Sequence, residues 1–321
     1  MPPCGVLLDV VFVAVGLVLL ARAADVFVDA AAALAVRFGL PAVVIGAVVI
    51  GFGTSAPELL VSVLAAARDE TDVALGNAVG SNLANVTLVL GAAAILRPAL
   101  VARHILRREA PLSLAAVVAL AIAVQGGITR PEAVVLLLLL VPAIGTSLVL
   151  AERPSVESLG LAHQVEEQLA ADLAGATRRE VLRTLGGLVG TVAGAQLLVE
   201  GALGVADGLG LASGPIGLTL VAIGTSLPEL ATAISASRRG EADLVIGNVL
   251  GSNIFNSLAV AGTAGVVAPG AAETILGLPV YAMVGSMLLV WGLLWLKGNL
   301  NRIEAAILVV LYLVVAVAVL A

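Results

Sequence analysis

The sequence predicts an all-α polytopic membrane protein whose ten transmembrane helices form two inverted five-helix repeats. Composition is the first reason. Of the 321 residues, 60% are hydrophobic and 12% are charged, and the mean hydropathy is +1.14, whereas soluble domains carry about 25% charged residues. The second reason is a series of apolar runs long enough to cross a bilayer. The third is a polar motif that occurs twice along the chain.

Apolar runs of about 20 residues define the expected helices in chain order. They are 6–36, 41–67, 72–96, 108–125, 132–150, 180–207, 214–237, 242–267, 273–296 and 303–320. The first and sixth runs are long enough to tilt or to extend beyond the bilayer. A hydrophilic segment, 151–179, separates five helices from five. We therefore expect a first repeat at 1–150, a short loop at 151–179 and a second repeat at 180–321.

The first run has some features of a signal peptide. Val6–Leu20 is apolar, and Ala21-Arg22-Ala23 resembles a cleavage site. However, no Lys or Arg precedes the run, and Asp9 lies at its start. We expect a retained first helix.

The basic residues predict how the chain crosses the membrane. Thirteen of the sixteen Lys and Arg residues fall on one side of the predicted helices, after helices 1, 3, 7 and 9 and around the central loop. The positive-inside rule then places the central loop in the cytoplasm and both termini outside the cell membrane. Because each half has an odd number of helices, equivalent helices of the two halves run in opposite directions, as in the inverted repeats of secondary transporters.

The repeated motif is the strongest functional signal in the chain. Gly53-Thr54-Ser55-Ala56-Pro57-Glu58 returns as Gly224-Thr225-Ser226-Leu227-Pro228-Glu229, at an offset of 171 residues. The same offset relates Gly76-Asn77 to Gly247-Asn248, Gly80-Ser81-Asn82 to Gly251-Ser252-Asn253, and Asn85 to Asn256. The two motifs span residues 53–85 and 224–256. An inverted repeat would bring them together near the middle of the membrane.

The residue types in the motif predict a site for hard cations. Proline disrupts a helix by losing one hydrogen bond and clashing with the carbonyl four residues back, so we expect the second and seventh helices to break at Gly-Thr-Ser. Freed carbonyls are tolerated in a membrane only where they line a cavity or find partners. The expected ligands are all oxygens, from Glu58, Glu229, Thr54, Thr225, Ser55, Ser226, Ser81, Ser252, Asn85 and Asn256. Such a set suits Ca²⁺. Two carboxylates balance one Ca²⁺ or two Na⁺, so competition between these ions would produce exchange.

The same residues also have simpler structural interpretations. One transmembrane proline is commonly a benign kink, and one small-residue motif commonly serves helix packing; their repetition at one offset argues against both. Asp72 and Asp243 begin predicted helices and fit a structural role at a helix N-terminus. Without Cys, Met or His in the motifs, soft-metal transport is not expected. A passive channel and an intramembrane enzyme are disfavoured. Discontinuous inverted repeats suit a carrier, and no nucleophile or phosphate loop accompanies the glutamates.

The motif residues resemble those of the cation/calcium exchanger superfamily, and in particular its prokaryotic sodium/calcium exchangers (antiporters). The resemblance covers essentially the whole chain. It implies that helices 2, 3, 7 and 8 hold the ions while helices 1 and 6 slide across them. It also implies that Glu58 and Glu229 bind Ca²⁺ with the carbonyls of Thr54 and Thr225. Flanking Na⁺ sites would use Ser55, Ser81, Ser226 and Ser252, and the middle of the cage would be lined by Asn85 and Asn256.

One departure from the family concerns Asn256, where several members have Asp. The amide argues against K⁺ co-transport and leaves two acidic ligands rather than three. The alternative function is a Ca²⁺/H⁺ (or other cation/H⁺) antiporter, although proton-coupled relatives usually have Asn-Ala-Thr in place of Gly-Thr-Ser. We expect transported Ca²⁺ and Na⁺, no cofactor, no nucleic-acid partner, residence in a lipid bilayer and function as a monomer.

Overall fold

The fold is almost entirely helical. The computed structural model describes residues 3–37, 55–100, 103–151, 177–240, 242–272 and 276–320. The first half contains α1 (Pro3–Arg37), α4 (Ala56–Ala66), α5 (Thr71–Ala84), η2 (Asn85–Val89), α6 (Leu90–Leu96), β1 (Ala99–Leu100), α7 (Arg103–Ala123) and α8 (Arg130–Ala151). Residues 41–54 of the second expected helix and most of the expected central loop lie outside the described residues.

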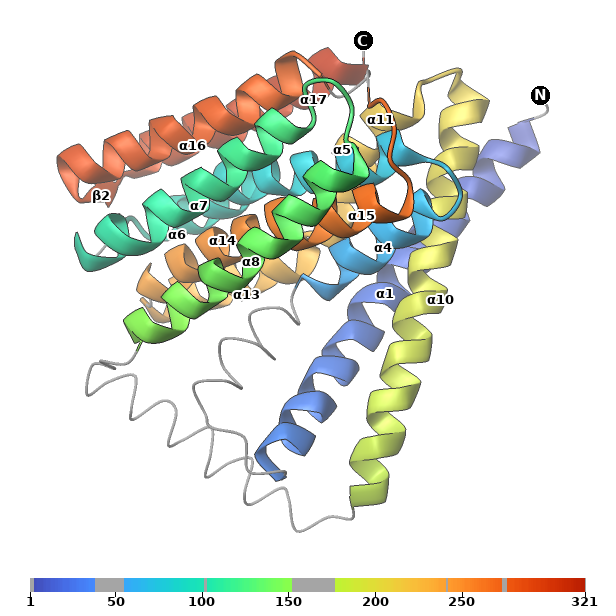
Figure 1. The fold of residues 1–321 in the computed structure, drawn as a ribbon, viewed down its shortest axis with the longest axis horizontal. Coiled ribbons are helices and arrows are strands. Elements are labelled where there is room, and N and C mark those ends of the chain that lie inside the picture. Colours follow the sequence, from blue (N-terminus) through green and yellow to red (C-terminus); the bar gives the residue numbers. More distant parts are fainter. Residues whose placement is uncertain are drawn as a thin grey trace.

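The second half has a similar order of helices, but its strand lies one connection later, between α16 and α17. It contains α10 (Thr177–Leu209), α11 (Ser213–Ile216), η3 (Gly217–Val221), α12 (Ala222–Thr225), α13 (Leu227–Arg239), α14 (Ala242–Phe255), η4 (Asn256–Val260), α15 (Ala261–Val267), α16 (Leu278–Lys297), β2 (Asn299–Leu300) and α17 (Arg302–Leu320). Figure 1 shows these helices packed as a bundle, with α1 and α10 extending beyond it.

Several helices are long and apolar enough to cross a membrane. Within the described residues there are six, or seven if the bent pair Gly214–Thr225 and Leu227–Arg238 forms one span. The six are Val6–Ala23, Thr71–Leu96, Arg179–Leu209, Val245–Val267, Leu278–Lys297 and Arg302–Leu320. The chain is therefore a membrane protein with several apolar helices, as its composition predicts.

Burial separates core helices from peripheral ones. The spans Thr71–Leu96 and Val245–Val267 are each 78% buried, whereas Val6–Ala23 and Arg302–Leu320 are each 22% buried. The two buried spans are the continuous rods α5-η2-α6 and α14-η4-α15. The centre of the molecule is thus formed by the two helices that carry the Gly-Asn and Gly-Ser-Asn parts of the repeated motif.

Each buried rod contains one π-helical turn at the same place in its repeat. η2 begins at Asn85 and η4 at Asn256. Such turns insert an extra residue into a helix and occur often at functional sites. Here they occur where the motif asparagines face the centre of the molecule, a feature that the sequence pattern does not reveal.

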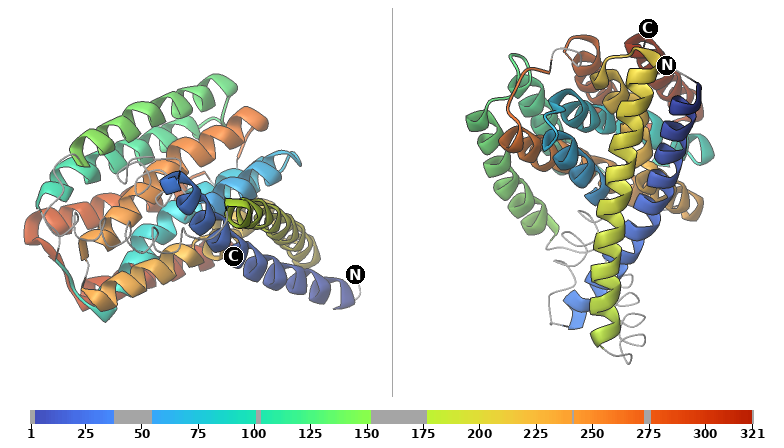
Figure 2. Two further views of the ribbon diagram at one scale, coloured as in Figure 1. Left: turned by 90° about the horizontal axis from the view of Figure 1, so that it is seen from below. Right: turned by 90° about the vertical axis from the view of Figure 1, so that its right-hand side faces the viewer.

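The helices α1 and α10 pack against each other along their length, as both panels of Figure 2 show. They have 35 and 33 residues, in line with the long first and sixth apolar runs. Glycines make the close approach possible. A Cβ added at Gly16, Gly187, Gly194 or Gly201 would lie 2.5 to 2.7 Å from backbone atoms of the facing helix. Small residues at such positions are typical of helix pairs in membranes.

The bend that the sequence predicts in the seventh helix is present. The helix axis turns by 42° between Gly214–Thr225 and Leu227–Arg238. Ser226 is the turn residue, and Pro228 lies in the first turn of α13, where its missing N–H leaves no intrahelical bond unmade. The break expected before α4 falls on residues outside the described part of the chain.

The last helix of each half begins with a reciprocal cap. The Thr129 N–H donates to Glu132 Oε2 at 2.9 Å, and the Asn301 N–H donates to Glu304 Oε2 at 3.0 Å. In both pairs the N-cap side chain in turn accepts from the N–H of the glutamate. Such capping boxes satisfy backbone donors that the first helical turn leaves free.

Candidate ion-binding site

Two buried carboxylates form the centre of the site. Glu58 lies in the first turn of α4 and Glu229 in the first turn of α13, and their exposed fractions are 0% and 1%. Both follow a proline at the helix start, so the backbone N–H groups and the helix dipole favour negative charge at this place. Burial of a carboxylate is costly unless a charged partner or hydrogen bonds compensate it.

The two halves of the site are joined by reciprocal hydrogen bonds. The Ser55 hydroxyl donates to Glu229 Oε1 at 3.3 Å, and the Ser226 hydroxyl donates to Glu58 Oε1 at 3.2 Å. Each serine therefore contacts the glutamate of the opposite repeat. The sequence predicts that the motifs meet, and the structure brings these four side chains together.

The remaining motif serines differ in their contacts. The Ser55 oxygen also lies 3.2 Å from Ser252 Oγ, so it can accept the Ser252 hydroxyl hydrogen while its own hydrogen bonds Glu229. Ser81, which is the equivalent of Ser252 in the first motif, is buried, and its hydroxyl has no hydrogen-bond partner among the described residues. The two repeats thus build similar but unequal halves of the site.

Asn77 connects the site to both repeats, although the sequence reading assigned it no ligand role. Its amide nitrogen donates to the Glu58 carbonyl oxygen at 3.2 Å and to Ser62 Oγ at 2.9 Å. Its amide oxygen accepts from the Thr225 hydroxyl at 3.1 Å. The repetition of Asn77 as Asn248 was a signal for this role. Ser62 had no such signal, because the equivalent residue is Ala233.

The motif asparagines of α5-η2 and α14-η4 face one another across the core. Asn85 Nδ2 donates to Asn253 Oδ1 at 3.1 Å, and Asn82 Nδ2 donates to Ser257 Oγ at 2.9 Å. Asn256 is fully buried, and neither polar atom of its amide has a hydrogen-bond partner among the described residues. Asn82, Asn253 and Ser257 were not predicted as site residues.

The oxygens that lack a hydrogen-bond partner indicate which class of ligand the site can bind. Within the described residues, both motifs contribute buried oxygens without a partner: Glu58 Oε2, Glu229 Oε2, Ser81 Oγ, Asn82 Oδ1, Asn85 Oδ1 and Asn256 Oδ1. Buried polar atoms in native proteins are normally satisfied. An all-oxygen set with two carboxylates has the chemistry of a hard-cation site, for which Ca²⁺ takes six to eight oxygen ligands.

The site differs from a transition-metal centre in its ligand types. The described part of the chain contains no group of three or more His, Cys, Asp or Glu side chains. Amides and hydroxyls therefore have to complete the coordination of any cation held between Glu58 and Glu229. Of the ten predicted ligands, Thr54 lies outside the described residues, and the other nine are buried together in the core.

Comparison with known proteins assigns the chain to a family. The sequence profile described as "Sodium/calcium exchanger protein" matches residues 8–149 and residues 180–321. The chain belongs to this exchanger family. Its members are transporters, so the chain is an exchanger of the cation/calcium exchanger superfamily and not an enzyme.

Alignments with individual relatives cover nearly the full length of the exchanger. It is 38% identical to "Putative antiporter CaxA" of Alkalimonas amylolytica, over 96% of this chain and 97% of the relative. It is 28% identical to "Sodium/calcium exchanger MaX1" of Methanosarcina acetivorans, over 92% and 94% of the two chains. Among solved structures, the sodium-calcium exchanger NCX_Mj soaked with 10 mM Na⁺ and no Ca²⁺ is similar, with a TM-score of 0.66 and 30% identity. The alignment covers 98% of this chain and 99% of that chain.

Proposed function

We propose that the chain is a secondary active antiporter that exchanges Ca²⁺ for Na⁺. The observation that carries this proposal is the pair of reciprocal contacts, Ser55 with Glu229 and Ser226 with Glu58, at a fully buried cluster of oxygens. Two carboxylates balance the charge of one Ca²⁺ or of two Na⁺. Because either occupancy neutralises the site, binding of one ion type excludes the other, and the site can return across the membrane loaded with either.

The ions bind between α4, α5, α13 and α14, where the two motifs meet. Glu58 and Glu229 bind Ca²⁺ together with the carbonyls of Thr54 and Thr225. Ser55, Ser81, Ser226 and Ser252 contribute to flanking Na⁺ sites. Asn85 and Asn256 line the middle of the cage. The partnerless oxygens of Glu58, Glu229, Ser81, Asn85 and Asn256 support these assignments, because an oxygen already engaged by a protein donor is a poorer ligand.

Alternating access occurs by movement of α1 and α10 relative to the core. These helices pack mainly on each other, which supports their moving as one unit. The ten helices form two inverted repeats, 1–150 and 180–321, joined by the loop 151–179. Because the repeats are inverted, the same movement can open the site to either side of the membrane. We place the exchanger in the cell membrane as a monomer without a cofactor, with both termini outside and the central loop in the cytoplasm.

A flux assay tests the proposal. The purified protein is reconstituted into proteoliposomes, and radioactive Ca²⁺ uptake is measured with opposing gradients of Na⁺, K⁺ and H⁺ imposed one at a time. We expect uptake only with Na⁺ inside and its loss when an ionophore collapses the Na⁺ gradient. Uptake that follows a pH gradient and ignores Na⁺ would identify a Ca²⁺/H⁺ antiporter. Single-channel currents would contradict both carrier mechanisms.

A further inference from the structure

A second cavity lies away from the ion site, where α7 begins and α16 ends. Its volume is about 320 Å³. The residues that line it include Leu106 and Arg107 from α7 and Leu294, Trp295, Leu296 and Lys297 from α16. It combines basic groups, an aromatic ring and leucines, which differs from the oxygen-rich chemistry of the ion site.

The positive charge at this cavity is available for a ligand. Arg107 is exposed, and among the described residues its guanidinium has no hydrogen bond or ion pair. Lys297 is paired with Glu304, whose other carboxylate oxygen accepts from the Asn301 N–H at 3.0 Å. One acceptor leaves hydrogens of the ammonium group free to donate. The cavity thus presents one unpaired cation and one oriented ammonium group.

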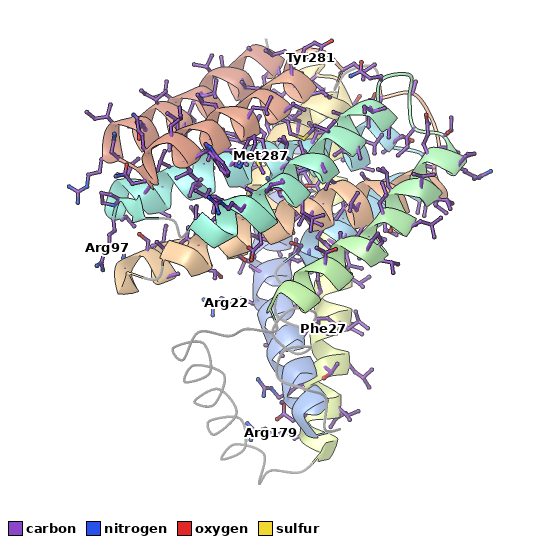
Figure 3. All side chains as sticks on the ribbon, turned by 60° about the vertical axis from the view of Figure 1, so that its left-hand side comes forward. Arg22, Phe27, Arg97, Arg179, Tyr281 and Met287 are labelled. Atoms are coloured by element: carbon purple, nitrogen blue, oxygen red, sulfur yellow. The ribbon has the colours of Figure 1, made fainter. Side chains whose placement is uncertain are left out.

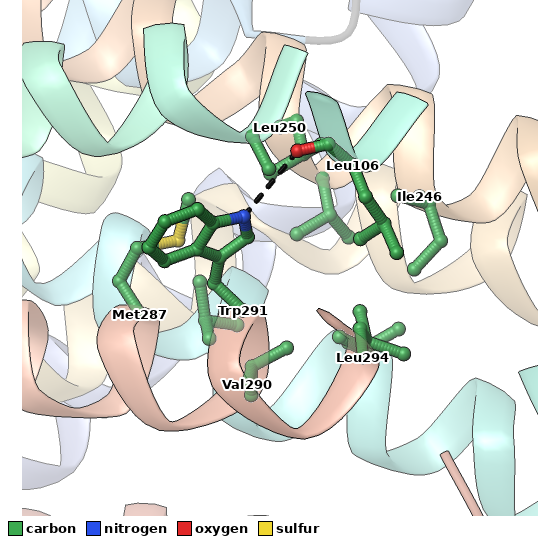
Figure 4. A pocket seen from close by; sticks show the side chains of 11 residues that line it. Leu106, Ile246, Leu250, Met287, Val290, Trp291 and Leu294 are labelled. Carbon is green, nitrogen blue, oxygen red and sulfur yellow. Dashed lines mark hydrogen bonds between the residues drawn. The ribbon is translucent and has the colours of Figure 1, made fainter. Parts of the chain in front are cut away.

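Of the two tryptophans of the chain, Trp295 lines this cavity and Trp291 lines a smaller pocket that shares Leu106 and Leu294 with it. The Trp291 indole N–H donates to the Leu106 carbonyl at 3.3 Å, which ties α16 to α7 (Figure 4). The Trp295 ring centroid lies 5.9 Å from that of Trp291, and the Trp295 side chain is 51% exposed. Tryptophans are enriched where membrane helices pass through the lipid headgroup region. This end of α7 and α16 is therefore at headgroup depth.

The apolar part of a ligand would have to lie outside the protein. A smaller apolar pocket shares Leu106 and Leu294 with the cavity, but its volume of about 20 Å³ is too small for a hydrocarbon chain (Figure 4). The outer face of α16 offers an alternative path through Trp295, Gly292, Leu288, Gly285 and Tyr281, which follow one another at helical spacing. Leu288 and Tyr281 are 47% and 67% exposed. A Cβ added at either glycine would meet no described atom within 4 Å. The surface of α16 is therefore open at both glycines, where no side chain projects.

We propose that this cavity binds the headgroup of an anionic phospholipid, with an acyl chain lying along the outer face of α16. Arg107 and Lys297 contact the phosphate oxygens, and Trp295 packs against the glycerol region. Basic pockets between transmembrane helices bind acidic headgroups in other membrane proteins. The binding site is independent of the ion site and of the direction of transport.

The native tryptophans report directly on this site. The full-length protein is reconstituted into phosphatidylcholine that contains increasing fractions of brominated phosphatidylglycerol, and quenching of tryptophan fluorescence is recorded. Brominated phosphatidylcholine gives the reference curve. Each basic residue near an anionic lipid is worth about a fivefold gain in association. We therefore expect at least a fivefold preference for phosphatidylglycerol, reduced about fivefold by Arg107→Gln and retained by Arg107→Lys.

Arg179→Gln is the matched control, because Arg179 is also exposed and lies at the far end of α10, away from Met287 and this cavity (Figure 3). It should leave the preference unchanged. The proposal would be overturned if the wild-type protein gave the same quenching curve with both brominated lipids. It would also be overturned if Arg107→Gln and Arg179→Gln reduced the preference for phosphatidylglycerol equally. Inorganic phosphate should not remove the preference when compared with chloride of equal ionic strength. If phosphate does remove it, the cavity is a small-anion site and the lipid assignment is wrong.

Discussion

At the scale of single residues, the site depends on contacts between opposite repeats. Each glutamate keeps one oxygen for a serine of the other motif and one oxygen without a described partner. A hydroxyl can rotate to accept or to donate, so Ser55 and Ser226 can hold the carboxylates in place both with and without a cation. These serine–glutamate contacts favour a site whose carboxylates stay in place when one ion replaces another.

We expect Glu58→Gln and Glu229→Gln each to reduce Ca²⁺ uptake by at least about 100-fold, because removing one charge from a buried charged group costs about 3 kcal/mol or more. Both variants should still insert and remain folded, since glutamine has the same shape. Uptake is measured in proteoliposomes with a Na⁺ gradient.

The control for these variants is Glu200→Gln. Glu200 is 51% exposed and paired with Arg68 at 2.7 Å, and exposed pairs contribute about 1 kcal/mol or less. This variant should transport normally. Wild-type exchange in Glu58→Gln or Glu229→Gln would show that the buried glutamate is not an ion ligand.

Asn256 is the second residue whose substitution is informative. Asn256→Asp adds a third carboxylate to the site without breaking any described hydrogen bond of Asn256. We expect the Na⁺ concentration for half-maximal exchange to shift several-fold, or a K⁺ dependence to appear, because a charge attracts a further cation. The measurement is Ca²⁺ flux against varied Na⁺ and K⁺. Unchanged dependence on both ions would show that Asn256 does not contribute to the ion site.

At the scale of elements, glycines decide how closely helices pack. Gly80 in α5 lies against η3 and α12, where an added Cβ would be 2.2 Å from the Leu218 carbonyl oxygen. The α1–α10 pair shows the same arrangement over a greater length. The composition predicts close packing of this kind, but 35 glycines in the sequence do not indicate which of them face a neighbouring helix.

Two glycines of α10 provide a matched pair of variants. A Cβ at Gly194 would lie 2.5 Å from the Leu20 backbone nitrogen, whereas a Cβ at Gly186 would meet no described atom within 4 Å. We expect Gly194→Ala to destabilise the protein by about 1–3 kcal/mol through overpacking, and Gly186→Ala to be neutral or slightly stabilising because alanine favours helix. Thermal denaturation in detergent distinguishes them. Equal denaturation midpoints would contradict the close contact of α1 and α10.

At the scale of the whole molecule, the ends of the helices divide into two groups. β1 pairs with β2, so the end of α6 and the end of α16 lie together. The loop residue Ile128 pairs with Gly270 at another place, which brings the α7–α8 connection to the end of α15. This division follows the alternation expected for a chain that crosses a membrane repeatedly, and Arg97, Lys297 and Arg302 lie near the first group.

Cysteine labelling tests the proposed orientation, because Cys4 is the single cysteine of the chain and can be replaced. In a Cys4→Ser background, we expect Gly126→Cys to react with an impermeant maleimide in intact cells and Arg179→Cys to react only after permeabilisation. Both positions are exposed. The reverse pattern would show that the chain is inserted in the opposite direction.

The sequence by itself determined the membrane class, the exchanger family and the residues of the repeated motif, because apolar runs, basic residues and a constant offset are properties of the linear chain. It also predicted that Ser55, Glu58, Ser226 and Glu229 meet, since an inverted repeat has that consequence. The tertiary structure alone decided the departures from symmetry. Ser62, Asn82, Asn253 and Ser257 became part of the polar core through hydrogen bonds between segments far apart in the chain, and such pairing depends on side-chain positions that no spacing rule encodes.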